Sequence, residues 1–159
     1  MSRDGRITRK IEFDAGHRIP LHDSKCRSVH GHRYVLEATI CGPIIEQVGS
    51  DEGMVCDFGR LKDVMIEAVG GWDHSFLVYS GDDEVVSFLR RLPGQQFVIM
   101  SNIPTVENLA RCAFGRIEAI VSHRGLRLVH VRLYETPNCW ADVTEQEYHG
   151  ENQVDVPRV

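Results

Sequence analysis

One thiol and two imidazoles fall within seven residues of the stretch "CRSVHGHRY", which begins at Cys26. His30 and His32 are two residues apart, so both side chains point to the same side if this stretch is a strand. His17 ends an earlier alternating stretch on its apolar face. If the two strands are neighbours, the three imidazoles converge into the ligand set of a catalytic zinc site, which leaves a fourth position open.

The role of Cys26 distinguishes two kinds of metal site. As a fourth ligand Cys26 would close the site and make it structural, and its spacing from His30 permits this. Against this reading, a thiolate ligand weakens the metal as a Lewis acid, and a chain of 159 residues can fold without a metal. Lys25 and Arg27 flank Cys26 and favour its thiolate form, which suits a proton acceptor. On spacing alone both sites, and ordinary structural histidines, remain open.

Two further groups of residues suit acid–base chemistry. Asp73 precedes His74 in a predicted loop, where a carboxylate can orient an imidazole and stabilise its charged form. A solvated pair is the alternative. Glu135 follows Val131 and Leu133 on the apolar face of a predicted strand, where a carboxylate needs a partner. A ligand with an amine and a ring N–H would supply that partner, and a salt bridge at the end of the sheet is the alternative.

Hydrophobic periodicity predicts the elements that must position these residues. Alternating apolar residues predict one strand over 6–17 and another over 30–41. An apolar stripe behind a capping residue predicts a helix after Asp57 and a second helix after Thr105. The remaining expected elements are a short helix over 83–91 and strands over 96–100, 126–135 and 139–145.

The order of the main elements is two strands, two helices and two strands. This order predicts an α+β fold with a four-stranded antiparallel sheet and two main helices on one face. We expect the whole chain, 1–159, to be a single domain with its core over about 6–147 and a loose polar C-terminal tail. In a monomer the edges of the sheet would be unpaired, and oligomerisation would cover them.

Composition limits the classes of partner. The formal net charge is −5 and no basic run is present, which argues against nucleic acid as a partner. No apolar run approaches the ~20 residues that span a bilayer, and the first ten residues lack the apolar stretch of a secretory signal. An odd number of cysteines, five, argues against a disulfide framework. We therefore expect a cytoplasmic protein with no membrane partner.

Six motifs occur in the order and spacing of the 6-pyruvoyl-tetrahydropterin synthase superfamily: "FDAGH", "C-x3-HGH", "DFGRLK", "WDH", "PTVENLA" and "YETP". The chain resembles this superfamily over about 6–147. It is more similar to the bacterial branch, which makes 6-carboxy-tetrahydropterin in queuosine biosynthesis, because the gap after the cysteine is short. The resemblance implies a tunnelling fold (T-fold), in which antiparallel sheets from several subunits form a barrel. It also implies a homohexamer of two trimers with active sites between subunits.

The resemblance also implies a role for each matching residue. His17, His30 and His32 match the zinc ligands, and Cys26 matches the catalytic thiol. The other matches are Asp73 and His74 in a proton relay, Glu135 as the anchor of the pterin and sometimes part of the relay, and Thr105 and Glu107 in the segment that contacts the pterin ring.

The implied reaction is the zinc-dependent conversion of 7,8-dihydroneopterin triphosphate to 6-carboxy-5,6,7,8-tetrahydropterin, with release of acetaldehyde and triphosphate. This would make the protein a carbon–carbon and carbon–oxygen lyase. A 6-pyruvoyl-tetrahydropterin synthase, or a related enzyme that cleaves the pterin side chain, is the alternative. A non-catalytic zinc module for assembly is the alternative from a different class. Imidazole ligands also suit iron, nickel and copper.

Two features bear on substrate preference and phosphate binding. Ser75 stands where the family often has a histidine or arginine, and the segment 80–102 is longer than in the shortest members. The triphosphate needs cations, which the sequence does not single out. The cations near the predicted site are Arg18, Lys25, Arg27 and Arg33.

Overall fold

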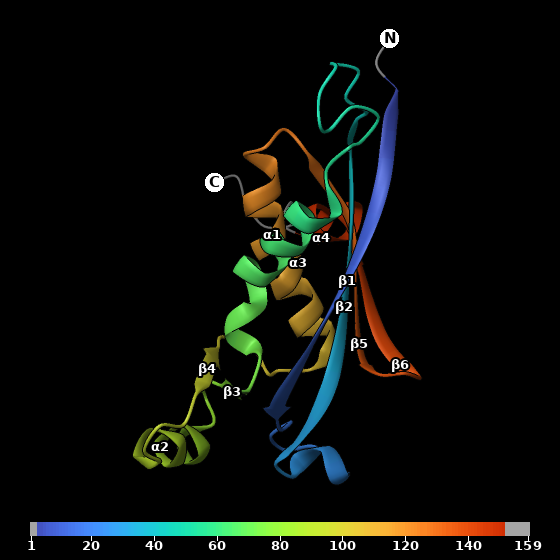
Figure 1. Cartoon of the computed structure of the whole chain (residues 1–159). Coiled ribbons are helices and arrows are strands. Elements are labelled where there is room, and N and C mark those ends of the chain that lie inside the picture. The colour runs from blue at the N-terminus through green and yellow to red at the C-terminus, as the bar shows by residue number, and fades with distance from the viewer. Residues whose placement is uncertain (1–2, 152–159) are drawn as a thin grey trace, which may run out of the picture.

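The computed structural model describes residues 3–151, which form strands and helices (Figure 1). The strands are β1 (Asp4–His17), β2 (His30–Pro43), β3 (Ser75–Tyr79), β4 (Phe97–Met100), β5 (Arg127–Thr136) and β6 (Cys139–Thr144). The α-helices are α1 (Phe58–Val69), α2 (Asp83–Arg91), α3 (Val106–Ser122) and α4 (Glu145–Glu151), and short 3-10 helices lie at Lys25–Arg27 and Gly70–Trp72. Within the described residues, no helix has the length and apolar character needed to cross a membrane.

The six strands form one mixed sheet in the order β4-β3-β1-β2-β5-β6. β1 and β2 pair antiparallel along their whole lengths, and β5 and β6 continue this antiparallel part. β3, however, runs parallel to the end of β1, and β4 runs parallel to β3. The expected four-stranded antiparallel sheet is therefore wrong in its number of strands and in the strand direction at one edge.

The parallel edge of the sheet was missed because β3 shows no alternation. Its sequence, SFLVY, is buried at four successive positions. A short continuous apolar run fits a buried strand or a buried helix equally well by periodicity. α2 then supplies the crossover that a parallel pair of strands requires. The short helix predicted over 83–91 is confirmed, but it belongs to this extension of the sheet.

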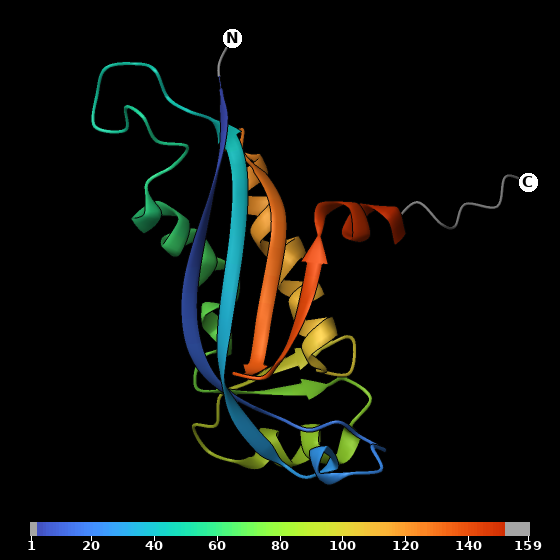
Figure 2. The same cartoon turned by 90° about the vertical axis from the view of Figure 1, so that its right-hand side faces the viewer.

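α1 and α3 cover one face of the antiparallel part of the sheet, as predicted (Figures 1 and 2). The Asp57 side chain caps α1 by accepting hydrogen bonds from the amides of Gly59 and Arg60. The Thr105 side chain caps α3 by accepting a hydrogen bond from the amide of Asn108. Both caps were expected from the sequence, because a capping residue immediately before an apolar stripe is a local signal. The buried stripes of both helices join the sheet in one core.

The chain after β6 differs from the predicted loose tail. Thr144 and Glu147 form a capping box, in which each side chain accepts a hydrogen bond from the other residue's amide. Tyr148 then stacks on a phenylalanine ring of α3, with the ring centroids 4.7 Å apart. The prediction of a loose tail is therefore wrong as far as Glu151, and residues 152–159 lie outside the described part of the chain.

Most of β1 has an open edge. β3 pairs only with the residues Ala15 to His17 of β1. In the part of the chain that the structure describes, the backbone of residues 4–13 therefore has a neighbouring strand on the β2 side only. An open edge of this length is a surface that can pair with another strand.

Candidate metal centre and active site

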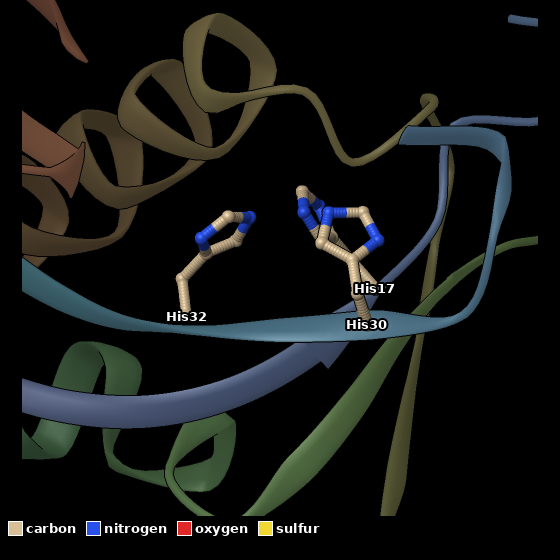
Figure 3. Close-up of side chains that lie close together, drawn as sticks. All are labelled: His17, His30 and His32. Atoms are coloured by element: carbon tan, nitrogen blue, oxygen red, sulfur yellow. The ribbon is translucent and has the colours of Figure 1, made fainter. Parts of the chain in front are cut away.

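The paired ends of β1 and β2 bring the three predicted imidazoles together (Figure 3). His17 pairs opposite His30, and His32 lies two residues further along β2 on the same face. The ligating nitrogens of the three side chains all lie within 4.8 Å of one another. The ring centroids are 4.6 to 5.1 Å apart. The group can hold a metal ion, and its occupation by zinc stays a prediction.

Two backbone carbonyls orient two of the rings. His17 Nδ1 donates a hydrogen bond to the carbonyl oxygen of Pro104 at 2.8 Å, and His30 Nδ1 donates one to Ser28 at 2.7 Å. A carbonyl oxygen can only accept, so each ring carries its proton on Nδ1 and leaves Nε2 available as a ligand. Hydrogen bonds of this kind fix the orientation of metal-binding imidazoles.

Burial favours the neutral form of two imidazoles. The His17 side chain is 1% exposed, and burial lowers the pKa of His17 below its ordinary value. Burial also lowers the pKa of His32. Among the described residues, Nε2 of His32 is buried and has no hydrogen-bond partner. A buried nitrogen without a partner is costly unless a ligand satisfies it, and three neutral imidazoles fit the ligand set of Zn²⁺.

Glu135 lies at the edge of the imidazole group. Its Oε1 is 3.4 Å from Nε2 of His17 and 3.7 Å from Nε2 of His32. These are weak contacts, because an ion pair needs a protonated imidazole and the pKa of both rings is lowered. The side chain is 23% exposed. The carboxylate therefore keeps the capacity to accept hydrogen bonds from a ligand beside the metal position.

Cys26 lies in the loop that joins the two histidine-bearing strands. It is half-buried within the short helix Lys25–Arg27. Its carbonyl oxygen accepts a hydrogen bond from the amide of Ile19 at 2.9 Å, which closes the loop. In the described part of the chain, the group of ligating atoms within 4.8 Å of one another contains the three imidazoles and leaves Cys26 outside. This arrangement favours an open metal site over a closed structural one.

Asp73 and His74 form a pair. The distance from His74 Nδ1 to Asp73 Oδ2 is 3.0 Å, and Asp73 Oδ1 accepts a hydrogen bond from the amide of Asp14 at 2.9 Å. The Asp14 amide and the His74 side chain together lower the pKa of Asp73. The His74 side chain is 77% exposed, and its backbone φ is +55°. In a single chain the pair is thus oriented by β1 but remains open to solvent.

Thr105 and Glu107 lie at the start of α3, directly after the Pro104 carbonyl that orients His17. Thr105 uses its hydroxyl to cap the helix. Glu107 is exposed and lines a surface hollow with Asp142 and Glu147, away from the imidazole group. Within one chain, the structure therefore does not bring Glu107 to the site, and its contact with a pterin stays a prediction.

The four nearby cations differ in how free they are to bind phosphate. Arg18 is paired with Asp82 at 2.6 Å. Arg33 is paired with Glu12 at 2.8 Å and with a second carboxylate at 3.1 Å. Lys25 and Arg27 are both exposed beside Cys26. The last two are therefore the stronger candidates for contact with a triphosphate.

Sequence reasoning missed the groups that hold the imidazoles and the loop. The carbonyls of Ser28 and Pro104 orient two rings, but backbone carbonyls carry no sequence signal. The partnership of Arg18 with Asp82 was also missed, because the two residues are 64 positions apart. The sequence signal for this pair was limited to the position of Arg18 directly after the predicted ligand His17.

Comparison with known proteins decides the family. The family model described as 6-pyruvoyl tetrahydropterin synthase matches residues 6–146. The chain belongs to this family. The resemblance seen in the six motifs is thereby confirmed. A curated relative from Rickettsia bellii, named 6-carboxy-5,6,7,8-tetrahydropterin synthase, is 39% identical over 144 residues, which covers 87% of this chain and 99% of the relative.

Solved structures share the fold. An uncharacterized protein from Wolinella succinogenes has a TM-score of 0.72 at 20% identity, with 91% of this chain and 99% of that chain covered. The 6-pyruvoyl tetrahydropterin synthase of Caenorhabditis elegans has a TM-score of 0.64 at 24% identity, with 90% and 96% covered. At these identities, the two structures are evidence for the fold alone.

Proposed function

We propose that the protein is a zinc-dependent lyase that converts 7,8-dihydroneopterin triphosphate to 6-carboxy-5,6,7,8-tetrahydropterin, a step of queuosine biosynthesis. The observation that carries this proposal is the convergence of three imidazoles into one group of ligating atoms, with a half-buried thiol outside that group. The name of the Rickettsia bellii relative supports the choice of product. Acetaldehyde and triphosphate are the other products.

His17, His30 and His32 are the residues that would hold the metal, through Nε2 at least in the two rings whose Nδ1 is engaged. Zinc held there would supply Lewis acidity, which would lower the pKa of a substrate hydroxyl and polarise the carbon next to it. The remaining chemistry is assigned to side chains of this protein.

Glu135 anchors the substrate in this proposal. Its carboxylate is partly exposed beside the imidazoles. The aminopyrimidine edge of a pterin offers an amine and a ring N–H side by side, and a carboxylate can accept both in a bidentate contact. This contact would direct the side chain of the substrate towards the metal position.

Cys26 acts as the base that removes a proton from the substrate's side chain. Cys26 lies between the exposed cations Lys25 and Arg27 in the short helix of the loop. His74, oriented by Asp73, transfers protons as the second acid–base group. Each well-placed group of this kind contributes about 10²–10⁴-fold to the rate.

The overall reaction is an internal redox change. The dihydropterin ring is reduced to a tetrahydropterin, while the side-chain carbon attached to it is oxidised to the carboxylate. The other two side-chain carbons leave as acetaldehyde, and the phosphate ester leaves as triphosphate. The reduction of the ring and the oxidation of the side chain balance each other, so the reaction needs no external oxidant or reductant. The overall reaction consumes one water molecule.

Active sites between the subunits of a homo-oligomer complete the proposal, with a hexamer of two trimers as the expected form. The open edge of β1 over residues 4–13 and the edge strand β6 support it, because strands from neighbouring subunits can pair there. The exposed position of His74 also fits a partner that approaches from another chain.

The main alternative is formation of 6-pyruvoyl-tetrahydropterin, which the family description and the Caenorhabditis elegans protein carry in their names. That reaction keeps all carbons of the side chain, so it releases no acetaldehyde. A non-catalytic zinc module is the alternative from another class, and the position of Cys26 outside the imidazole group disfavours it.

The test is anaerobic incubation of the zinc-loaded protein with 7,8-dihydroneopterin triphosphate, with every product identified by mass. We expect 6-carboxy-5,6,7,8-tetrahydropterin, acetaldehyde and triphosphate in equal amounts. The His30→Ala variant and metal-stripped protein serve as controls and should both be inactive. A pyruvoyl product without acetaldehyde would favour the alternative, and full activity in metal-stripped protein would exclude the metal mechanism.

A further inference from the structure

An ion pair between Arg18 and Asp82 lies next to the imidazole group. Arg18 follows His17, and its Nε and Nη2 donate hydrogen bonds to the two carboxylate oxygens of Asp82 at 2.6 and 2.8 Å. The Asp82 side chain is 5% exposed and the Arg18 side chain is 26% exposed. A bidentate pair of this kind fixes geometry as well as adding binding energy. It therefore joins the end of β1 firmly to the start of α2.

The position of Asp82 in its own helix indicates that this pair is more than a local contact. Asp82 is the N-cap residue of α2, but its side chain makes no capping hydrogen bond. An aspartate at this position usually accepts a hydrogen bond from an amide of the first turn. Here both oxygens are turned to Arg18 instead. The Asp82 carboxylate thus links α2 to the end of β1 and does not cap α2.

A short series of contacts leads from Arg18 to the thiol. Ile19, the next residue, donates its amide hydrogen bond to the carbonyl oxygen of Cys26 at 2.9 Å. The loop ends where the Ser28 carbonyl accepts a hydrogen bond from the ring of His30. The loop therefore begins and ends at histidines of the imidazole group, and Figure 1 shows it at the same end of the molecule as α2.

We propose that Arg18 and Asp82 form a clamp that positions the Cys26 loop beside the three imidazoles. In this account both are positioning residues, since neither contacts the reacting atoms. The segment 80–102 thereby gains a role, because it carries the acidic half of the clamp. The catalytic meaning of the clamp rests on the proposed function, whereas its effect on the thiol can be measured without turnover.

The test is the Asp82→Asn variant. Asparagine is almost the same size and caps helices as well as aspartate does, so the substitution removes the charge and one acceptor from the clamp. In zinc-loaded protein we measure alkylation of Cys26 by iodoacetamide with peptide-resolved mass spectrometry, relative to the exposed Cys139. We expect the ratio of Cys26 to Cys139 labelling to rise several-fold, with the zinc content unchanged.

Turnover supplies the second readout. Displacement of a catalytic group by about 1 Å can cost up to 10²-fold in rate, so kcat should fall by about ten- to a hundredfold, with a smaller change in KM. The Asp82→Glu variant keeps a carboxylate and should recover part of both readouts. The Arg18→Lys variant keeps the charge but loses the bidentate fork. It should shift the labelling ratio in the same direction, and it serves as the second variant if Asp82→Asn does not fold.

A matched control breaks an exposed ion pair elsewhere. Glu145→Gln removes the partner of Arg127, which lies 2.9 Å away, and should leave the labelling ratio and kcat unchanged. An unchanged ratio and kcat in folded, zinc-loaded Asp82→Asn and Arg18→Lys would overturn the clamp. A wild-type protein without turnover, but with the shifted ratio in both variants, would contradict the proposed function and support the clamp.

Discussion

His17 and His30 each donate a hydrogen bond from Nδ1 to a backbone carbonyl, and this decides which nitrogen faces the metal position. His32 differs, because its Nε2 is buried without a hydrogen-bond partner among the described residues. Burial and hydrogen bonds to backbone carbonyls thus leave nitrogens of these side chains available to bind a metal ion. Cys26 lies outside the imidazole group, in a loop that the Ile19 amide closes by a hydrogen bond to the Cys26 carbonyl oxygen.

Replacement of the thiol should separate metal binding from catalysis. The Cys26→Ala variant should fold and retain its zinc, because the imidazole group does not include Cys26. Its kcat should fall by about 10²–10⁴-fold, the usual contribution of a general base. Metal analysis and steady-state kinetics check both expectations, with Cys139→Ala as an unaffected control. A Cys26→Ala protein that loses its zinc would instead indicate a closed site with a thiolate ligand.

Acidification should release the metal only below the ordinary pKa of an imidazole. Burial lowers the pKa of His17 and His32 from the usual 6.5, so both rings stay neutral where a free imidazole begins to bind a proton. Zinc content after dialysis at a series of pH values should therefore hold at pH 6.5 and fall at lower pH. Release that begins above pH 6.5 would contradict the lowered pKa of these rings.

The same shift affects stability in the metal-free protein. Between the unfolded pKa of 6.5 and the lowered folded pKa, the unfolded chain binds more protons than the folded protein. The free energy of unfolding should therefore be highest above pH 6.5 and fall as the pH drops through this window. Denaturant titrations of the metal-free protein at pH 7.5 and 5.5 check this, and greater stability at pH 5.5 would refute it.

The elements of the fold differ in how far the sequence predicts them. β1, β2, α1 and α3 follow from their periodicity, and the caps Asp57 and Thr105 follow from local chemistry. β3 does not, because the short run SFLVY is buried without alternation, and such a run does not by itself distinguish a strand from a helix. The Thr144–Glu147 capping box was present in the sequence and was overlooked, which is why the chain after residue 147 was expected to be loose and α4 was not predicted.

Removal of the α1 cap should change the stability of the fold without changing the metal site. The Asp57→Ala variant loses the hydrogen bonds to two amides of the first turn, which should lower the free energy of unfolding by about 1 kcal/mol. Asp63→Ala, an exposed position within the same helix, is the control and should have little effect. Urea unfolding measures both variants. Zinc stoichiometry should be the same in both, and equal stability of the two variants would count against the cap.

At the scale of the whole molecule, a single chain does not bring all the predicted site residues together. Its imidazoles and thiol gather at one end of β1 and β2, while His74 is 77% exposed and Glu107 lines a different hollow. The sequence predicts these residues through a family resemblance, but periodicity and spacing do not place His74 or Glu107 relative to the imidazoles. The open edge of β1 over residues 4–13 is the feature of the chain that most favours assembly.

Mixed oligomers test whether one site uses two subunits. Cys26→Ala and His74→Ala should each be nearly inactive alone. If the thiol and the imidazole of one site come from different chains, oligomers assembled from both variants should regain part of the activity. The control mixes Cys26→Ala with the double variant and should regain nothing. Verified mixed oligomers without any regain would place both groups of each site in one chain.

X-ray absorption at the zinc edge of the zinc-loaded protein tests the central claim most directly, because it reports the ligand atoms themselves. The account predicts nitrogen and oxygen ligands at about 2.0–2.1 Å, from three imidazoles and one exchangeable oxygen, with no sulfur. A sulfur ligand at about 2.3 Å would place Cys26 on the metal and contradict its role as the base.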